Sequence, residues 1–218
     1  MIKHFKCILY LYVFIGYSFA LAGSYEVFFQ AVRDDDGSTV AALLQRGFDA
    51  NTPDPQSRNA LSLALSQPSV RVQQVLLNWP GTHIDQRNAQ DETPLMIAVL
   101  RGNLAAAKTL IDKDADVNKP GWAPLHYAAT NGHLDMMRLL LEHHAYIDAE
   151  SPNGSTPLMM AALYGSPESV KLLLDAGADP LLKNQQQLSA IDFAQRGSRT
   201  DSAALIAAAV RAQLAPEK

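Results

Sequence analysis

The side chains that could perform catalysis in this 218-residue sequence do not form the pattern of a common enzyme site. The G-x-x-x-x-G-K-S/T loop that cradles phosphate is absent, as are the G-x-S-x-G motif of serine hydrolases and the H-E-x-x-H motif of zinc hydrolases. The single cysteine, Cys7, lies in an apolar segment near the start of the chain. We therefore expect a protein that is not an enzyme and uses no cofactor, with carboxylate-based catalysis as an alternative.

Two short clusters contain residue types that bind metal ions. His143 and His144 follow Glu142, but adjacent residues at a helix end point in different directions and seldom share a metal. The sequence Asp-Asp-Asp-Gly at residues 34–37 resembles the start of a calcium loop, yet it lacks the alternating ligand spacing and the closing glutamate. We expect a solvated turn that caps the next helix at residues 34–37, and a metal site at His143–His144 is kept as an alternative.

A repeat of about 33 residues organises most of the chain. The motif Thr-Pro-Leu-Met-Ile-Ala at residues 93–98 recurs in similar form at residues 123–128 and 156–161. Degenerate copies occur at residues 59–64 and 189–194. The last alanines of these motifs are separated by 34, 30, 33 and 33 residues, and Ala31 extends the series upstream by another 33. A fixed period of this length predicts a stack of similar structural units.

Each copy contains two further motifs at similar distances from the first. A leucine-rich or alanine-rich stretch begins about seven residues after the closing alanine, as at residues 105–111, 135–141 and 168–174. A turn then ends the unit, and it contains an acid in four copies, namely Asp49, Asp116, Asp148 and Asp179. We expect these carboxylates to make hydrogen bonds within turns rather than to act in acid–base catalysis.

The residue types of each copy suit two short helices joined by a tight turn. Thr93 and Thr156 can cap a helix start, and the proline after each of them is tolerated at the first helical position. Gly102, Gly132 and Gly165 follow the first helix, where we expect them to adopt a left-handed conformation. Because one helix pair cannot bury its apolar face alone, neighbouring pairs must stack.

Over roughly residues 25–212 the pattern resembles the ankyrin repeat, whose signature is T-P-L-H-x-A with a period of 33 residues. The resemblance implies an all-α ankyrin solenoid of about six helix-turn-helix units with short β-hairpin-like loops. Within a repeat domain at residues 23–218, the units are expected at residues 25–52, 53–87, 88–118, 119–150, 151–184 and 185–214. His126 fills the histidine of the signature, and we expect it to form hydrogen bonds that tie neighbouring repeats together.

The resemblance also implies a protein-binding surface. In the family, binding positions lie just before T-P-L-H and just after its double alanine, on the concave face. In this sequence those positions are Gln90, Glu92, Leu100, Arg101, Trp122, Thr130, Asn131, Asn153, Ser155, Leu163 and Tyr164. We expect a partner to contact chiefly Leu100, Arg101, Trp122, Asn131, Leu163 and Tyr164. Aromatic and arginine side chains contribute most to binding energy, and Arg101 would pair with a carboxylate.

The first 22 residues predict a secretory signal peptide that is cleaved after Ala22. Lys3 and Lys6 precede an apolar stretch at residues 7–22, which closes with the small-residue pattern Ala-Leu-Ala. The stretch is shorter than a membrane-spanning helix requires. We expect export to a bacterial periplasm, with the membrane needed only for export, and the alternative is a scaffold tethered by an uncleaved anchor.

Charge and composition narrow the class of partner. The chain has 18 basic and 22 acidic residues, a net charge of −4, and no block of five or more basic residues. Nucleic-acid binding is therefore not expected, and the predicted partner is another protein. Exported bacterial ankyrin proteins that resemble this one include immunity-type proteins that block a toxic effector and accessory factors for stress-defence enzymes. Either role is a hypothesis for this chain.

Overall fold

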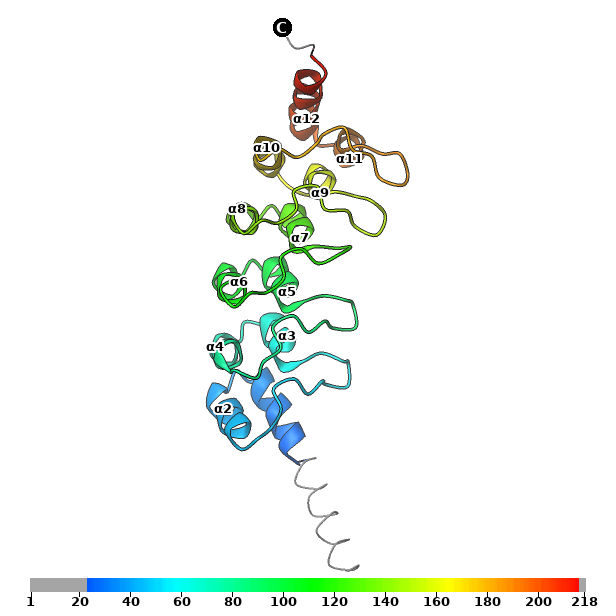
Figure 1. Ribbon diagram of the computed structural model, residues 1–218. Coiled ribbons are helices and arrows are strands. Elements are labelled where there is room, and N and C mark those ends of the chain that lie inside the picture. Colours follow the sequence, from blue (N-terminus) through cyan, green and yellow to red (C-terminus); the bar gives the residue numbers. More distant parts are fainter. Residues whose placement is uncertain (1–22, 216–218) are drawn as a thin grey trace, which may run out of the picture. The chain divides into compact units, whose positions relative to one another are not determined.

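The computed structural model describes residues 23–215, so the predicted signal peptide at residues 1–22 lies outside the described residues. The described residues are helical apart from loops and one antiparallel bridge between Lys183 and Ser189, which confirms the all-α prediction. They form two compact units that divide between Asp91 and Glu92, and each unit is described by itself (Figure 1). Within residues 23–215, no helix is both long and apolar enough to cross a membrane.

The first unit contains two helix pairs. A helix at residues 23–33 precedes α2 (Gly37–Gln45), and α3 (Ala60–Leu65) precedes α4 (Val70–Asn78). The second helices of the two pairs, α2 and α4, contact each other. The ring of Phe28, which is completely buried, stacks on the ring of Phe48 at a centroid distance of 4.3 Å. This aromatic pair closes the core at the first helix.

The second unit contains four helix pairs arranged in two layers. The first helices of the pairs are α5 (Pro94–Leu100), α7 (Pro124–Asn131), α9 (Pro157–Tyr164) and α11 (Ala190–Arg196). The second helices are α6 (Leu104–Ile111), α8 (Leu134–Glu142), α10 (Pro167–Asp175) and α12 (Thr200–Gln213). Successive helices within each layer contact one another, and the two columns are visible in Figure 1. Stacking therefore buries the leucine faces that a single pair would leave in water.

The first helices of this unit begin at the predicted caps. The side-chain oxygen of Thr93 accepts a hydrogen bond from the backbone N–H of Met96 at 3.2 Å, and Thr156 accepts one from Met159 at 3.4 Å. A proline occupies the first turn of α5, α7 and α9. These positions leave few backbone donors unsatisfied, because proline has no N–H to satisfy.

The glycines after the first helices serve two different purposes. Gly102 and Gly132 have φ values of 67° and 68°, so the predicted left-handed conformation is confirmed for both. The prediction is wrong for Gly165, which is extended with φ −76° and ψ −159°. A Cβ atom at Gly165 would lie 2.6 Å from the carbonyl oxygen of Ala129 and 2.9 Å from that of Ala161. Glycine is needed there because α9 ends directly against the backbone of α7.

His126 links two neighbouring repeats, as predicted. The side chain is completely buried at the start of α7. Its Nδ1 accepts a hydrogen bond from the backbone N–H of Ala123 at 3.1 Å, and its Nε2 lies 3.0 Å from the carbonyl oxygen of Ser155 in the next repeat. Burial lowers the pKa of the imidazole, so the neutral form is favoured, with Nε2 as the donor.

Methionine replaces this histidine in the repeats on either side. The sulfur atoms of Met96 and Met159 accept the backbone N–H groups of Thr93 and Thr156, each at 3.4 Å. Sulfur is a weak acceptor, and a thioether has no N–H to donate. These two repeats therefore keep the local cap but lack the histidine bond to the next repeat.

We expect Gly165→Ala to lower the free energy of unfolding by about 2 kcal/mol, since the added methyl group meets backbone atoms that cannot move aside. Urea unfolding followed by circular dichroism measures the change. The matched control is Gly81→Ala, where a Cβ atom would make only ordinary contacts with the Trp79 ring. Equal stability of the two variants would contradict the close-approach explanation.

We expect Met159→His to raise the free energy of unfolding by about 1 kcal/mol at neutral pH, the usual net value of one hydrogen bond. The carbonyl oxygen of Leu188 accepts the N–H of Asn184 just as that of Ser155 accepts the N–H of Ser151, so it occupies the matching position in the next repeat. His126→Met is the reciprocal control and should destabilise the chain. Thermal unfolding at pH 7.5 compares the three proteins, and a destabilised Met159→His variant would refute the proposed equivalence.

Candidate functional site

The six residues predicted to bind a partner all lie in the second unit. Five of them occupy the C-terminal ends of its first helices: Leu100 and Arg101 at α5, Asn131 at α7, and Leu163 and Tyr164 at α9. Since α5, α7 and α9 contact one another in sequence, these ends lie side by side (Figure 1). We use the name turn row for the segments that leave the first helices at residues 100–103, 130–133, 163–166 and 196–199.

The turn row combines exposed apolar and basic side chains. Tyr164 is 55% exposed and Leu100 is 37% exposed, while Leu163 is half-buried. Arg101 is exposed at the C-cap of α5. Asn131 is exposed, but its side-chain amide donates to the carbonyl oxygen of Tyr127 at 2.9 Å and so caps its own helix. A partner could therefore gain apolar contacts at Leu100 and Tyr164 and a charged contact at Arg101.

Trp122 is separated from the other five predicted residues. It precedes α7, a helix of 8 residues that spans about 12 Å, whereas Asn131 ends the same helix. The half-buried indole packs edge-on against the rings of His126 and Tyr127, with centroid distances of 5.3 and 6.4 Å. The expected binding strip is thus two separate surfaces, one at the loops and one at the turn row. Ser155, also among the family positions, is buried and carries structural hydrogen bonds.

A hollow that the sequence did not indicate lies beside the turn row. It has a volume of about 500 Å³ and is lined by Gly102, Leu104, Gly132, His133, Leu134, Asp135, Met136 and Arg138. Leu104 is 37% exposed although it begins a helix whose buried positions are Ala106, Ala107, Leu110 and Ile111. An apolar residue outside the buried stripe was the available sequence signal, and only the stacking of repeats shows that it borders a cavity.

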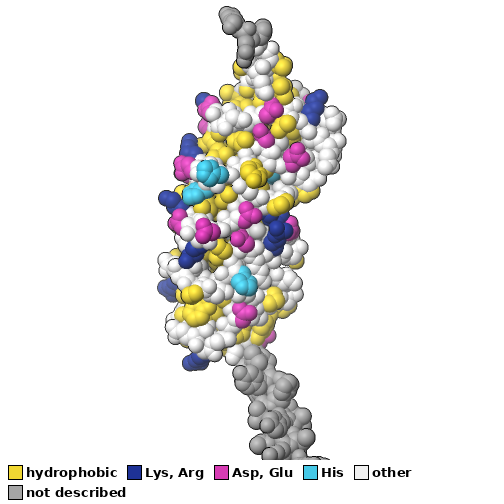
Figure 2. All heavy atoms as spheres, in the orientation of Figure 1, with side chains coloured by type: hydrophobic (Ala, Val, Ile, Leu, Met, Phe, Trp, Pro, Cys, Tyr) yellow, Lys and Arg dark blue, Asp and Glu magenta, His cyan; other side chains and the backbone are white. Residues whose placement is uncertain are grey.

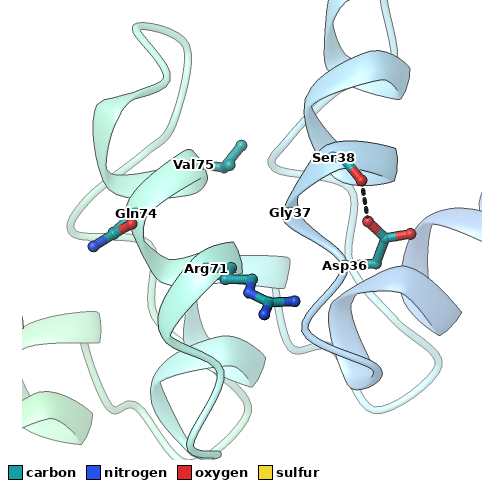
Figure 3. Close-up of a pocket in the computed structure, with 6 residues that line it drawn as sticks. All are labelled: Asp36, Gly37, Ser38, Arg71, Gln74 and Val75. Carbon is teal, nitrogen blue, oxygen red and sulfur yellow. Dashed lines mark hydrogen bonds between the residues drawn. The ribbon is translucent and has the colours of Figure 1, made fainter.

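The acidic cluster at residues 34–37 has a structural role in the first unit. Asp36 caps α2 by accepting from the backbone N–H of Thr39 at 3.1 Å, and Asp35 accepts from the N–H of Val72 at 2.9 Å. Hydrogen bonds from Ser38 and Thr39 lower the pKa of Asp36 to about 2. An open hollow of about 470 Å³ adjoins this carboxylate, which Figure 3 shows bonded to Ser38.

The histidine pair considered as a metal site ends a helix. His143 is the C-cap of α8, and His144 adopts the left-handed conformation with φ 64°. Among residues 23–215, no three His, Cys, Asp or Glu side chains gather closely enough to hold a metal ion. On the face drawn in Figure 2, Lys and Arg side chains lie interspersed with Asp and Glu.

Asp148 is a repeat-turn acid whose pKa is raised. Its two carboxylate oxygens share the backbone N–H of Asp179, each at 3.2 Å. Burial raises the pKa of Asp148, and the nearby Asp179 carboxylate adds to the rise. Asn118 occupies the same position one repeat earlier, where its amide donates to the carbonyl oxygen of His144 and accepts from the N–H of Tyr146. Asp148 therefore connects two repeats, whereas Asp49 and Asp116 accept the backbone N–H groups of Asn51 and Asn118 within their own turns, as the sequence predicted.

Comparisons with known proteins identify the repeat. A family profile described as ankyrin repeats in three copies matches residues 28–120 and 118–184. Ankyrin repeat and SAM domain-containing protein 6 of Mus musculus is 39% identical over 104 residues, which are 45% of this chain and 12% of that protein. The B-cell lymphoma 3 protein homolog of Mus musculus is 32% identical over 152 residues, 66% of this chain and 34% of the relative. This chain thus spans about a third or less of either relative.

One solved structure is similar over most of the chain. It is the complex of the predatory endopeptidase Bd0816 from Bdellovibrio bacteriovorus with immunity protein Bd3460. One chain of that complex aligns with a TM-score of 0.72 and 25% sequence identity, and the match covers 84% of this chain and 97% of the other.

We expect Asp148→Asn to stabilise the chain by about 1 kcal/mol at pH 7, because the amide can also donate to the carbonyl of residue 177, as Asn118 donates to that of His144. The folded-state pKa of Asp148 is raised, so its contribution to stability is greatest at acid pH and falls as pH rises above the usual aspartate value. The gain should therefore be larger at pH 7 than at pH 4. Urea unfolding at both values checks this, and an equal gain would exclude the carboxylate as its source.

Proposed function

The chain belongs to the ankyrin-repeat family, and from that premise we propose that it is exported to a bacterial periplasm and acts there as an immunity-type protein. Ankyrin repeats are protein–protein interaction modules, so the direct activity is non-catalytic binding of a partner protein. In the proposed role, binding blocks the activity of a toxic enzyme, and a protease is the class we consider first.

The observation that supports this role is the structural likeness to a chain of the endopeptidase–immunity protein complex. That match extends over 84% of this chain and 97% of the other, so it involves nearly the whole repeat array rather than one helix pair. A chain that consists almost entirely of such repeats is suited to binding another protein. The amino-terminal signal-peptide pattern at residues 1–22 supports export.

The proposed contact surface is the exposed part of the second unit. The turn row supplies Tyr164, Leu100 and Arg101, and Trp122 supplies an aromatic edge at the loops. Binding energy in protein interfaces concentrates on a few aromatic and arginine side chains. We therefore expect loss of Trp122 and Tyr164 to weaken binding while leaving the fold intact, since both rings are partly or largely exposed.

The test begins with the chain purified from its host's periplasm. Mass spectrometry of the amino terminus should give Gly23 as the first residue, and a retained residue 1 would favour the tethered scaffold instead. The chain and a Trp122→Ala, Tyr164→Ala double variant then serve as baits in native periplasmic extract. A captured protein is purified and mixed with each bait to measure stoichiometry, affinity and enzyme activity.

An immunity role predicts a tight one-to-one complex, inhibition of the captured enzyme, and at least a tenfold weaker complex with the double variant. Circular dichroism of the variant should match that of the natural chain. A resident enzyme that is bound without inhibition, together with peroxide sensitivity after gene deletion, would replace this role with the stress-defence accessory role. Unchanged binding by the double variant would move the contact surface elsewhere on the repeats.

A further inference from the structure

We propose that the hollow beside the turn row binds a short extended segment of the partner in which an apolar side chain is flanked by carboxylates. The apolar side chain enters the hollow between the α5–α6 and α7–α8 turns, and a carboxylate pairs with Arg101. This inference rests on the proposed function and specifies where and by what chemistry the partner is recognised.

The walls of the hollow combine polar surface with an apolar part that suits an apolar side chain. Leu104 and Leu134 begin the two second helices α6 and α8, and both remain partly exposed, while Met136 is buried behind them. Together they leave apolar surface in contact with water within a hollow of about 500 Å³. A leucine or phenylalanine side chain that fills this space would remove apolar surface of both partners from water.

Gly102 keeps the hollow open and fixes the position of His133. A Cβ atom at residue 102 would lie 3.3 Å from both Cε1 and Nε2 of the His133 ring, so the imidazole packs directly over the glycine backbone. Gly102 also has a φ of 67°, a conformation that other residues adopt with strain. The imidazole therefore lines the hollow beside Gly102, the residue that follows Arg101.

The charges around the hollow favour an acidic segment. The turn row contains Arg101, Arg196 and Arg199 and no carboxylate, although the whole chain has a net charge of −4. Asp135 borders the hollow, but it is paired with Arg138 at 3.2 Å. The side chain of Arg199 donates to the backbone carbonyl oxygen of Tyr164 at 3.3 Å, which places a cation at the C-terminal end of α9.

Three acids lie just beyond the turn row, in the first turns of the second helices, and Asp135 is the one that borders the hollow. Glu168 and Asp201 sit in the first turns of α10 and α12, and neither lines the hollow. The opposite ends of the helix pairs carry the turn acids Asp116, Asp148 and Asp179. At the turn-row end the arginines thus lie beside a similar number of acids, whereas the opposite end carries the turn acids, so an acidic segment is repelled less at the turn row and can pair with Arg101 there.

A random dodecapeptide library displayed on phage is selected on the purified full-length chain. We expect enriched sequences to contain leucine, phenylalanine or methionine next to aspartate or glutamate. A synthetic peptide of the enriched sequence is then titrated by fluorescence anisotropy. Arg101→Glu and Leu104→Ala should each weaken its binding at least tenfold, and higher salt should weaken binding to the natural chain.

Two control variants carry matched changes at the opposite end of the helix pairs. Lys113→Glu reverses an exposed charge, and Tyr146→Ala removes a side chain from a residue that is 67% exposed. Both should bind the peptide like the natural chain. All four variants must show the same thermal unfolding as the natural chain for the comparison to count.

The outcomes separate this inference from the proposed function. If the enriched peptides bind all variants equally, the chain binds peptides at a site other than the hollow. That result would overturn this inference and leave the proposed function intact. Enrichment of basic peptides would overturn the charge argument. If no peptide is enriched while a periplasmic enzyme is captured and inhibited, the extended segment is refuted and the immunity role stands. Failure of capture and inhibition, with peptide binding intact, would refute the immunity role alone.

Discussion

Each helix pair of this chain depends on its neighbours to cover its apolar face. In the second unit the first helices α5, α7, α9 and α11 lie against one another, and the second helices form a parallel layer. Close contact between first helices requires small residues where the backbones approach. Gly165 shows the constraint most directly, because a single Cβ atom there would overlap two carbonyl oxygens. Packing between repeats, more than helix propensity, therefore holds such short helices together.

Polar groups at the repeat boundaries add to this packing without being identical from repeat to repeat. His126 connects its repeat to the carbonyl of Ser155, and Asn118 connects the closing turns. Methionine sulfurs take the histidine position on either side, and Asp148 takes the position of Asn118. Each replacement keeps one hydrogen bond and gives up another, so the stability of the stack is distributed unevenly along it.

Partner binding depends on the side chains that remain exposed once the repeats have packed against one another and their polar groups are paired. The closing turns use many of their polar side chains on backbone groups, as Asp116, Asn118 and Asp148 illustrate. In the turn row Leu100, Arg101 and Tyr164 remain exposed, and beside it lies a hollow that is partly lined by apolar side chains. In the proposed complex, an extended segment of the partner contacts both the apolar side chains and the arginines of the turn row.

The repeat period, the two-helix unit, the capping threonines and the left-handed Gly102 and Gly132 could all be predicted from the sequence. These features are local, because a cap or a turn depends on residues a few positions apart. Tertiary structure alone decided which side chains meet between repeats. It brought Leu104 and His133 to one hollow and made Gly165 a close-contact residue. Such neighbours come from different repeats, so their meeting depends on how the helices stack, and spacing along the chain does not specify it.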